Sequence, residues 1–541
     1  MNEFIRPYEW KRFFWAALAC LIIYLGIEVM PMFTSAESDE YYGAVIDKSE
    51  AESKAAAFAE ELTGQQVRNA KAVHQSDKVL NGYLSKEDLI STYGEQYDAR
   101  FPSDTFQVDL ELQQSGSGYV YVHMQSGEVV NWNFKVDGGQ LSDTDKTAAI
   151  RDFMVKQSFR AEEISGGKLN ESGEWQAEPA GFSIKDAKLG VTVQAESLNG
   201  KTVITKYKAA FAAPSGYIRY VEGQDKIAGF LTGFGYLFMS FVLFVLAVVY
   251  AILYRKFTSF KYGIILTVVF LITYIIMNLN VLDGIRASLG ETGGSDETVL
   301  ITAVFTVFMT VPMAASVYIS MVAGDGLWKA QGRRLWPRFG DQGYGKYVWR
   351  SVGLSYLFAV ILFALQSVIF IGLEFTIGTW STTDVTQSPY NMAFLWLMPV
   401  LAWAAAISEE AVFRFFGIGL FRKWFKNTFA AALLPTLFWA LGHVMYPFYP
   451  SSTRLIELMI VGLVFSFIFV RYGFITSMFT HAIFNSAAVG MSLLAVGSAP
   501  NIVSAVFFTV LPVPIAYMIQ YLSSKKEKRP PVRTTPPLMP Q

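Results

Sequence analysis

The chain begins with one apolar run long enough to cross a membrane and continues, after a long polar stretch, with a series of similar runs. The first run covers residues 13–33, and about 20 apolar residues suffice to cross a hydrocarbon core of about 30 Å. The later runs lie at 227–254, 262–282, 298–323, 351–376, 392–420, 428–446, 455–470, 474–497 and 502–522. This pattern predicts a polytopic α-helical membrane protein with about ten transmembrane helices.

The polar stretch covers residues 35–226 and has the composition of a folded water-soluble region. Apolar residues at helical spacing predict helices in 54–62 and 147–159. Strands are predicted where apolar residues alternate with period two, in 106–112, 119–122, 129–134, 190–194 and 202–210. Because a helix followed by strands occurs twice, we expect an α+β region after the first helix, made of two tandem modules.

The composition narrows the class of protein further. Hydrophobic residues make up 52% of the 541, which is too apolar for a single soluble domain of this length. The formal net charge of -1 gives no sign of a nucleic-acid partner, and we expect none. The single cysteine, Cys20, excludes an intrachain disulfide and a metal site built from several cysteines.

Basic residues predict how the chain is oriented. Lys11 and Arg12 precede the first run, which favours a cytoplasmic N-terminus and an uncleaved signal anchor. Alternate later loops are rich in lysine and arginine, while the loops between them hold only Arg286 and Arg454. We therefore predict a multi-pass protein of the cell membrane, with both termini in the cytoplasm and residues 35–226 outside it.

Charged side chains stand out inside the apolar run 392–420. Glu409, Glu410 and Arg414 lie there, although an ionised group at membrane depth costs at least about 2.5–3.5 kcal/mol. Glu410 and Arg414 are spaced i,i+4, so they can form a structural ion pair on one helix face. Glu409 points about 100° away from Glu410 around the helix, and we expect it to face groups from other helices.

Two of the four histidines lie in later apolar runs and are candidates to meet Glu409. His443 ends the sequence Phe438-Trp439-Ala440-Leu441-Gly442-His443, and His481 stands four residues before Asn485 on one helix face. An unpaired carboxylate, two imidazoles and an amide can build a hydrolytic site. Such a site requires these groups to meet around one water molecule, away from the lipid.

These motifs resemble the CPBP family of intramembrane proteases, also called Abi or CAAX amino-terminal protease family, which includes the type II CAAX prenyl endopeptidases. The resemblance rests on Glu-Glu-x-x-x-Arg at 409–414, an aromatic residue four positions before His443, and His-x-x-x-Asn at 481–485. It covers roughly residues 350–522. The family more often has phenylalanine where this chain has Trp439, although Phe438 is adjacent.

The residues allow two mechanisms of peptide hydrolysis. In the first, Glu409 is the general base for a water molecule, His443 shares or relays the proton, and His481 with Asn485 stabilises the oxyanion. The resemblance implies the same roles. The predicted catalytic residues are Glu409, Glu410, His443, His481 and Asn485. In the second, Glu409, His443 and His481 bind a catalytic zinc ion that holds the water. The sequence does not decide between them.

The sequence predicts five segments. These are an N-terminal signal-anchor helix (1–34), the extracytoplasmic α+β region (35–226), accessory transmembrane helices with a basic cytoplasmic loop (227–350), the CPBP-like protease core (351–522) and a disordered cytoplasmic tail (523–541). The expected partners are the lipid bilayer and a membrane-embedded or membrane-associated peptide substrate. The alternative function is a non-catalytic receptor or bacteriocin-immunity-type protein with an external sensor domain. A transporter is a third, less favoured class.

Overall fold

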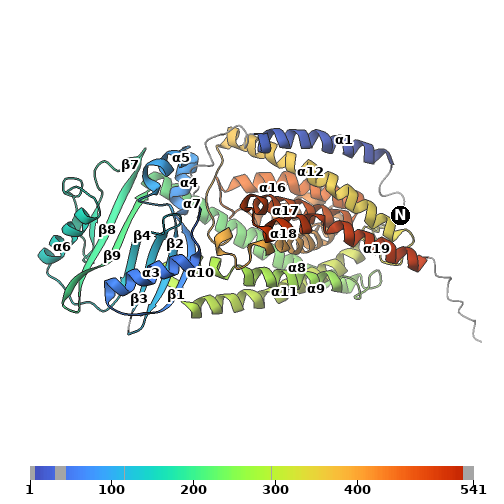
Figure 1. Cartoon of the computed structure of the whole chain (residues 1–541). Helices are drawn as coiled ribbons and strands as arrows, with labels where there is room; N and C mark the ends of the chain where they lie inside the picture. Colours follow the sequence, from blue (N-terminus) through green and yellow to red (C-terminus); the bar gives the residue numbers. More distant parts are fainter. Residues whose placement is uncertain (1–6, 31–43, 115, 294, 528–541) are drawn as a thin grey trace, which may run out of the picture.

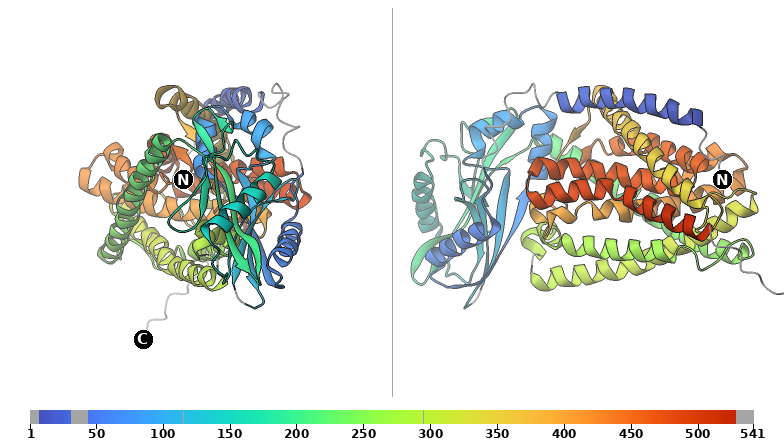
Figure 2. Two further views of the ribbon diagram at one scale, coloured as in Figure 1. Left: turned by 90° about the vertical axis from the view of Figure 1, so that its left-hand side faces the viewer. Right: turned by 45° about the vertical axis from the view of Figure 1, so that its right-hand side comes forward.

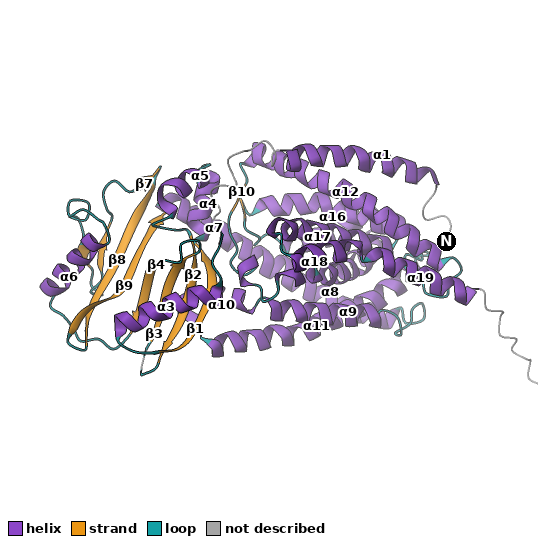
Figure 3. Ribbon diagram, in the orientation of Figure 1, coloured by secondary structure: helices purple, strands orange, loops and turns teal. Residues whose placement is uncertain are grey.

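The computed structural model describes residues 7–30, 44–114, 116–293 and 295–527. The chain forms two parts, a sheet-rich domain and a helical bundle, which lie end to end (Figures 1 and 2). Figure 3 shows that the strands gather in the first part and the long helices in the second. We call the first part, from Lys48 to Ala212, the sheet domain.

The sheet domain contains one continuous nine-stranded sheet. Its main path runs β1-β2-β3-β4-β9-β8-β6-β5, and β7 pairs with β8. The strands are β1 Val67–Ser76, β2 Asp104–Leu112, β3 Ser117–His123, β4 Val129–Lys135, β5 Lys168–Leu169, β6 Trp175–Ala177, β7 Ser183–Ile184, β8 Ala187–Leu198 and β9 Lys201–Ala212. The helical elements are α3 Lys48–Thr63, α4 Lys78–Lys86, α5 Ile90–Tyr93, η2 Gly94–Asp98 and α6 Asp143–Lys156.

The two helix-and-strand halves expected from the sequence share this sheet. Strand β4 of the first half pairs with β9 of the second, with Trp132 opposite Tyr207. The predicted strands correspond to β2, β3, β4, β8 and β9, and the predicted helices to α3 and α6. Strand β1 was not predicted, because its burial pattern has no regular alternation.

The two faces of the sheet differ in polarity. Val108 and Val120 point to the buried face, where the alanines at positions 51, 55 and 59 of α3 are fully buried and allow close packing. On the opposite face, Tyr121 and Asn133 hydrogen bond Glu291 of the helical bundle. One face is therefore the core of the domain, and the other is a polar contact with the bundle.

The bundle begins with α1 Pro7–Tyr24 and resumes two residues after β9. Its first elements are α1, η1 Leu25–Val29, α7 Ser215–Phe230, η3 Leu231–Phe238, α8 Met239–Leu253, α9 Ile264–Asn280, α10 Leu282–Gly293, α11 Asp296–Ala330 and α12 Tyr344–Ile377. Short elements follow: β10 Trp380–Ser381, η4 Pro389–Asn391 and η5 Leu395–Leu397. The remaining elements are α13 Val400–Glu409, η6 Glu410–Ile418, α14 Gly419–Phe425, α15 Thr428–Leu441, β11 Phe448–Tyr449, α16 Ser452–Tyr472, α17 Phe474–Val496, α18 Ala499–Val510 and α19 Pro512–Glu527.

Within the described residues, seven helices are long and apolar enough to cross a membrane, and two bent helix pairs raise the number to nine. The helix pairs are α9 with α10 and α18 with α19. The predicted span 428–446 corresponds to α15, which has only 14 residues. The bundle is that of a multi-pass membrane protein, but the prediction of ten spans is not confirmed.

Two predicted boundaries fall partly outside the described residues. The expected end of the first helix at residue 34 lies in the gap 31–43. Of the expected tail 523–541, residues 523–527 belong to α19, and the rest lies outside the described residues.

The helices closest to the candidate site approach one another at small residues. Gly462 of α16 faces α15 so closely that a Cβ atom there would lie 2.7 Å from both Thr436 Cγ2 and Trp439 Cζ3. Gly417 of η6 approaches Pro435 of α15 in the same way, at 2.8 Å. Small residues at such crossings bring the backbones together in membranes, so the elements that carry the candidate residues are held at short distance.

Candidate active site

The two adjacent carboxylates stand where α13 passes into a π-helical segment. Glu409 is the last residue of α13, and Glu410 is the first residue of η6. Short π-helical stretches are frequent at functional sites because they re-aim side chains. Glu410 is fully buried, whereas 18% of the Glu409 side chain is exposed. The two carboxylates therefore have different surroundings although they are neighbours in sequence.

The expected ion pair between Glu410 and Arg414 is present. Arg414 Nη1 lies 3.3 Å from Glu410 Oε1, and both side chains are inaccessible to solvent. The guanidinium also lies 4.0 Å from the ring centre of Trp439 and 5.4 Å from that of Phe465. A carboxylate and two aromatic faces thus compensate this buried positive charge.

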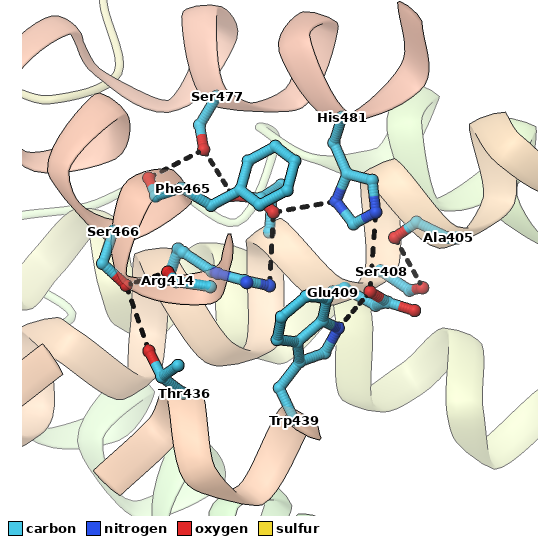
Figure 4. Close-up of polar contacts among 12 residues, drawn as sticks. Ala405, Ser408, Glu409, Arg414, Thr436, Trp439, Phe465, Ser466, Ser477 and His481 are labelled. Carbon is cyan, nitrogen blue, oxygen red and sulfur yellow. Dashed lines mark hydrogen bonds and ion pairs between the residues drawn. The ribbon is translucent and has the colours of Figure 1, made fainter. Parts of the chain in front are cut away.

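His481 bridges the two carboxylates (Figure 4). Its Nδ1 atom lies 2.9 Å from Glu410 Oε1, and its Nε2 atom lies 3.7 Å from Glu409 Oε2. An ionised carboxylate only accepts hydrogen bonds, so Nδ1 carries a proton and donates it to Glu410. Ser477, one turn earlier on α17, donates to the other oxygen of Glu410. Glu410 therefore fixes the tautomer and the orientation of the imidazole, as a carboxylate does for a metal-bound or catalytic histidine.

His443 lies just beyond the end of α15 and faces Glu409 from the other side. Its Nδ1 atom is 2.9 Å from the carbonyl oxygen of Trp439, and because a carbonyl only accepts, Nδ1 must be the donor. Its Nε2 atom then points to Glu409 Oε1 at 3.9 Å. The indole Nε1 of Trp439 donates a hydrogen bond to Glu409 Oε2, so α15 contributes a direct donor to this carboxylate and His443 lies beside it.

The cluster therefore has two layers. Glu410, Arg414 and His481 form an inner layer in which every side chain is at most 3% exposed. Glu409 and His443 form an outer layer, with 18% and 16% of their side chains exposed. The side chains of the outer layer can contact water and a substrate. The inner layer holds the outer layer in place.

Asn485 is the one predicted residue that does not join this network. It is half-buried, one turn beyond His481 on α17, and it makes no hydrogen bond within the part of the chain that the structure describes. Its amide is free to bind a group that is brought to the site.

Sequence reasoning did not find the contact residues Ser477 and the indole N–H of Trp439. Ser477, His481 and Asn485 are spaced by four on α17, so the helical repeat could have indicated the serine. The bond from Trp439 depends on the close approach of α15 to α13, which no local pattern encodes.

The arrangement does not match a zinc site. No group of three or more His, Cys, Asp or Glu side chains within the described ranges is placed to hold a metal ion. The two imidazole Nε2 atoms approach different oxygens of Glu409, and Oε2 already accepts the N–H of Trp439. Zinc ligands converge at about 2.0–2.2 Å from one point, and these side chains would have to move to do so.

Comparison with known proteins agrees with the motifs. No curated protein and no solved structure matches the chain. Residues 391–487 match a family model described as type II CAAX prenyl endopeptidase Rce1-like. This segment runs from η4 into α17 and includes Glu409, Glu410, Arg414, His443, His481 and Asn485. Residues 391–487 are thus similar to the CAAX-type (CPBP) intramembrane endopeptidases, as the motifs predicted.

Proposed function

We propose that the chain is an intramembrane endopeptidase in which Glu409 activates a water molecule for attack on a peptide bond. The observation that carries the proposal is the convergence of His443 Nε2 and His481 Nε2 on the two oxygens of Glu409, at 3.9 and 3.7 Å. Two atoms at that separation can both lie within hydrogen-bonding distance, about 2.8 Å, of one water oxygen beside them. A water molecule can therefore bridge Glu409 to His443 or to His481.

In the proposed reaction, Glu409 takes a proton from the water as its oxygen attacks the carbonyl carbon. General-base assistance of this kind contributes about 10²–10⁴-fold to a rate. The tetrahedral intermediate collapses when the bond between carbon and nitrogen breaks and the proton passes from Glu409 to the leaving amine. His443 Nε2, next to Glu409 Oε1, assists this transfer.

The negative charge on the intermediate needs donors. His481 lies between Glu410 and Glu409. When its Nε2 atom carries a proton, it donates to the oxyanion, and the amide of Asn485, one turn away, donates beside it. One such donor is worth about 2.7–4 kcal/mol to a transition state. Glu410 and Arg414 act through His481 as positioning residues.

The substrates under this proposal are peptides or proteins embedded in or attached to the bilayer. The protein would lie in the cell membrane with both chain ends in the cytoplasm and the sheet domain outside. The apolar helices of the bundle and the CAAX-type domain support a membrane-associated substrate.

Comparing the wild-type chain with Glu409→Gln tests the function. Both are expressed in membranes, and membrane peptides are compared by mass spectrometry without selecting a substrate in advance. We expect a set of cleaved peptides that disappears with Glu409→Gln, a loss of at least about 100-fold. Glu374→Gln is the matched control, because Glu374 is an exposed glutamate on α12, away from the cluster. Equal cleavage by wild type and Glu409→Gln would exclude hydrolysis at this site.

A chelator separates the two mechanisms. The proposed water activation uses only side chains, so activity should survive treatment with a strong zinc chelator followed by its removal. Loss of activity that returns on adding zinc would instead assign Glu409, His443 and His481 to a metal ion, with the metal lowering the pKa of the bound water.

A further inference from the structure

The sheet domain contacts the bundle at α7, where Lys78 pairs with Asp225 at 3.0 Å, and at two further places. One contact is with α10, which follows α9 and contains none of the proposed active-site residues. There, Asp283 pairs with Lys48 at 2.7 Å, and Glu291 accepts hydrogen bonds from Tyr121 and Asn133 at 2.7 and 2.6 Å. The other contact is with residues 379–391, the loop that connects α12 to the helix bearing Glu409. We call this second contact the loop joint.

Asn391 is the centre of the loop joint. Its Oδ1 atom accepts the backbone N–H of His74 on β1 at 2.7 Å, and its Nδ2 atom donates to the carbonyl of the same residue at 2.9 Å. The amide of one side chain thus replaces a neighbouring strand at the edge of the sheet. The same Nδ2 also donates to the carbonyl of Val385 at 2.9 Å, so Asn391 shapes its own loop as well. The residue is fully buried.

The side chain of His74 also belongs to the loop joint. Nδ1 lies 2.8 Å from Ser388 Oγ in the loop, and Nε2 lies 3.1 Å from Asp104 Oδ1 on β2. Ser388 accepts the backbone N–H of Tyr390, so its hydroxyl proton is available to His74 Nδ1. Two further hydrogen bonds join the sheet domain to the same loop. Ser76 bonds Thr383 at 2.7 Å, and Thr382 donates to the carbonyl of Lys78. Buried networks in which each group is satisfied are rigid.

The loop joint is connected to the segment before Glu409 and to the segment after His443. Towards Glu409, the loop is fixed again by Asn280 of α9, which bonds the backbone of Ala393 and Phe394, and α13 begins at Val400. Towards His443, β10 of the loop pairs with β11, and Thr382 N–H donates to the carbonyl of Pro447 at 2.9 Å. Pro447 is four residues beyond His443. The sheet domain therefore holds the segment before one active-site helix and the segment after the other.

We propose that Asn391 and His74 are positioning residues of the hydrolytic site, so that the sheet domain sets the distance between Glu409 and His443. The inference rests on the proposed function for its effect on rate. Its mechanical part, a link from the sheet domain to residues 443–452, stands on the contacts alone. The bond of Asn133 to Glu291 attaches the same domain to α10, which packs on the loop at a different residue, Gly284 against Thr386.

The test compares Asn391→Leu with Asn133→Leu in the full chain reconstituted in nanodiscs. Each variant replaces an amide at a contact between sheet domain and bundle by an apolar side chain of similar size. Cleavage is measured on a peptide identified by the Glu409→Gln comparison, and amide hydrogen exchange is measured by mass spectrometry. Asn391→Leu should lower kcat about tenfold with KM within about twofold, and should increase exchange in 395–409 and 443–452. Asn133→Leu should leave both readouts within about twofold of wild type.

A milder variant tests the same link if Asn391→Leu does not fold. Thr383→Val keeps the shape of the side chain and removes only its bond to Ser76, and it should shift both readouts in the same direction by about threefold. Unchanged exchange at 443–452 in the folded variants, or equal effects of the Asn391 and Asn133 substitutions, overturns the inference. If Glu409→Gln shows no loss of cleavage, the proposed function fails, while the exchange pattern still decides whether the link exists.

Discussion

At the residue scale, Trp439 connects the two helices that carry the outer layer of the site. Its indole N–H donates to Glu409, its carbonyl accepts from His443, and its ring lies over Arg414. Trp439→Phe keeps an aromatic ring for Arg414 and removes the donor to Glu409. We expect the rate of cleavage to fall about tenfold, the size of effect that 1.4 kcal/mol produces, because the carboxylate loses the bond that orients it. The thermal midpoint should also fall, since phenylalanine has three ring atoms fewer than the buried indole and leaves a small cavity.

The control for this variant is Trp424→Phe. That indole is exposed, and its N–H bonds Tyr250 at the surface of the bundle. Its loss should leave cleavage unchanged. If Trp439→Phe cleaves as fast as wild type, the indole bond has no part in orienting Glu409.

A second residue-scale prediction concerns Asp109 on β2. Burial raises the pKa of this carboxyl from its usual range to about 6, against the opposing effects of Gln107 and Arg286. Since the folded state holds the proton more tightly than the unfolded state, the contribution of Asp109 to stability is full below about pH 4 and is lost as the pH rises through 6. A shift of about two pKa units corresponds to about 3 kcal/mol.

Asp109→Asn keeps the group neutral at every pH. The thermal midpoint of the sheet domain should therefore rise relative to wild type at pH 7.5, and the difference should shrink as the pH is lowered from 6 towards 4. Calorimetry of both proteins across this range measures it. Glu111→Gln, on the same strand but with 45% of the side chain exposed, should show no comparable pH dependence. A constant difference at all pH values would contradict the titration of Asp109.

At the scale of elements, the approach of α15 to α16 determines whether Trp439 can reach Glu409. A Cβ atom at Gly462 would lie 2.7 Å from Trp439 Cζ3, a distance at which something must move. Gly462→Ala should push α15 and its indole away from α16. Overpacking of this kind costs about 1–3 kcal/mol, and we expect cleavage to fall at least about tenfold. Initial rates and thermal midpoints of the purified variant measure both effects.

Gly490→Ala on α17 is the matched control. A Cβ atom there would lie 3.5 Å from the Cβ atom of Ala505, which is an ordinary van der Waals contact. It should leave rate and stability near wild type. If Gly462→Ala behaves in the same way, the packing of α15 on α16 does not govern the site.

The elements also show what the sequence could and could not predict. Charged residues in an apolar run indicated the position of the site, because burying Glu409, Glu410 and Arg414 is too costly without partners. The i,i+4 spacing predicted the pair of Glu410 with Arg414, which the structure contains. The bridge of His481 between both carboxylates was not predictable, since it depends on how α17 crosses α13 and η6. Likewise, the 14-residue α15 was predicted as a full span because the apolar run continues past the end of the helix.

At the scale of the whole molecule, the distribution of basic residues predicts that the two ends of the bundle lie on opposite sides of the membrane. Helices α7, η3 and α8 form one continuous run of 39 residues that starts beside the sheet domain and leads away from it (Figure 1). The loop after it carries Arg255, Lys256 and Lys261, and basic residues also cluster at the far ends of α11, α14 and α19. Near the sheet domain, the segments that connect the long helices carry few basic residues, among them Arg286 and Arg454. Loops rich in lysine and arginine stay in the cytoplasm.

Labelling of single cysteines in intact cells tests this orientation. Replacing the one native cysteine by Cys20→Ser gives a background free of thiols. Lys201→Cys places a thiol in the exposed hairpin between β8 and β9, and Lys256→Cys places one in the exposed loop between α8 and α9. A maleimide that cannot cross the membrane should label the first variant in intact cells and the second only after the cells are opened. The reverse pattern would put the sheet domain in the cytoplasm and contradict the predicted orientation.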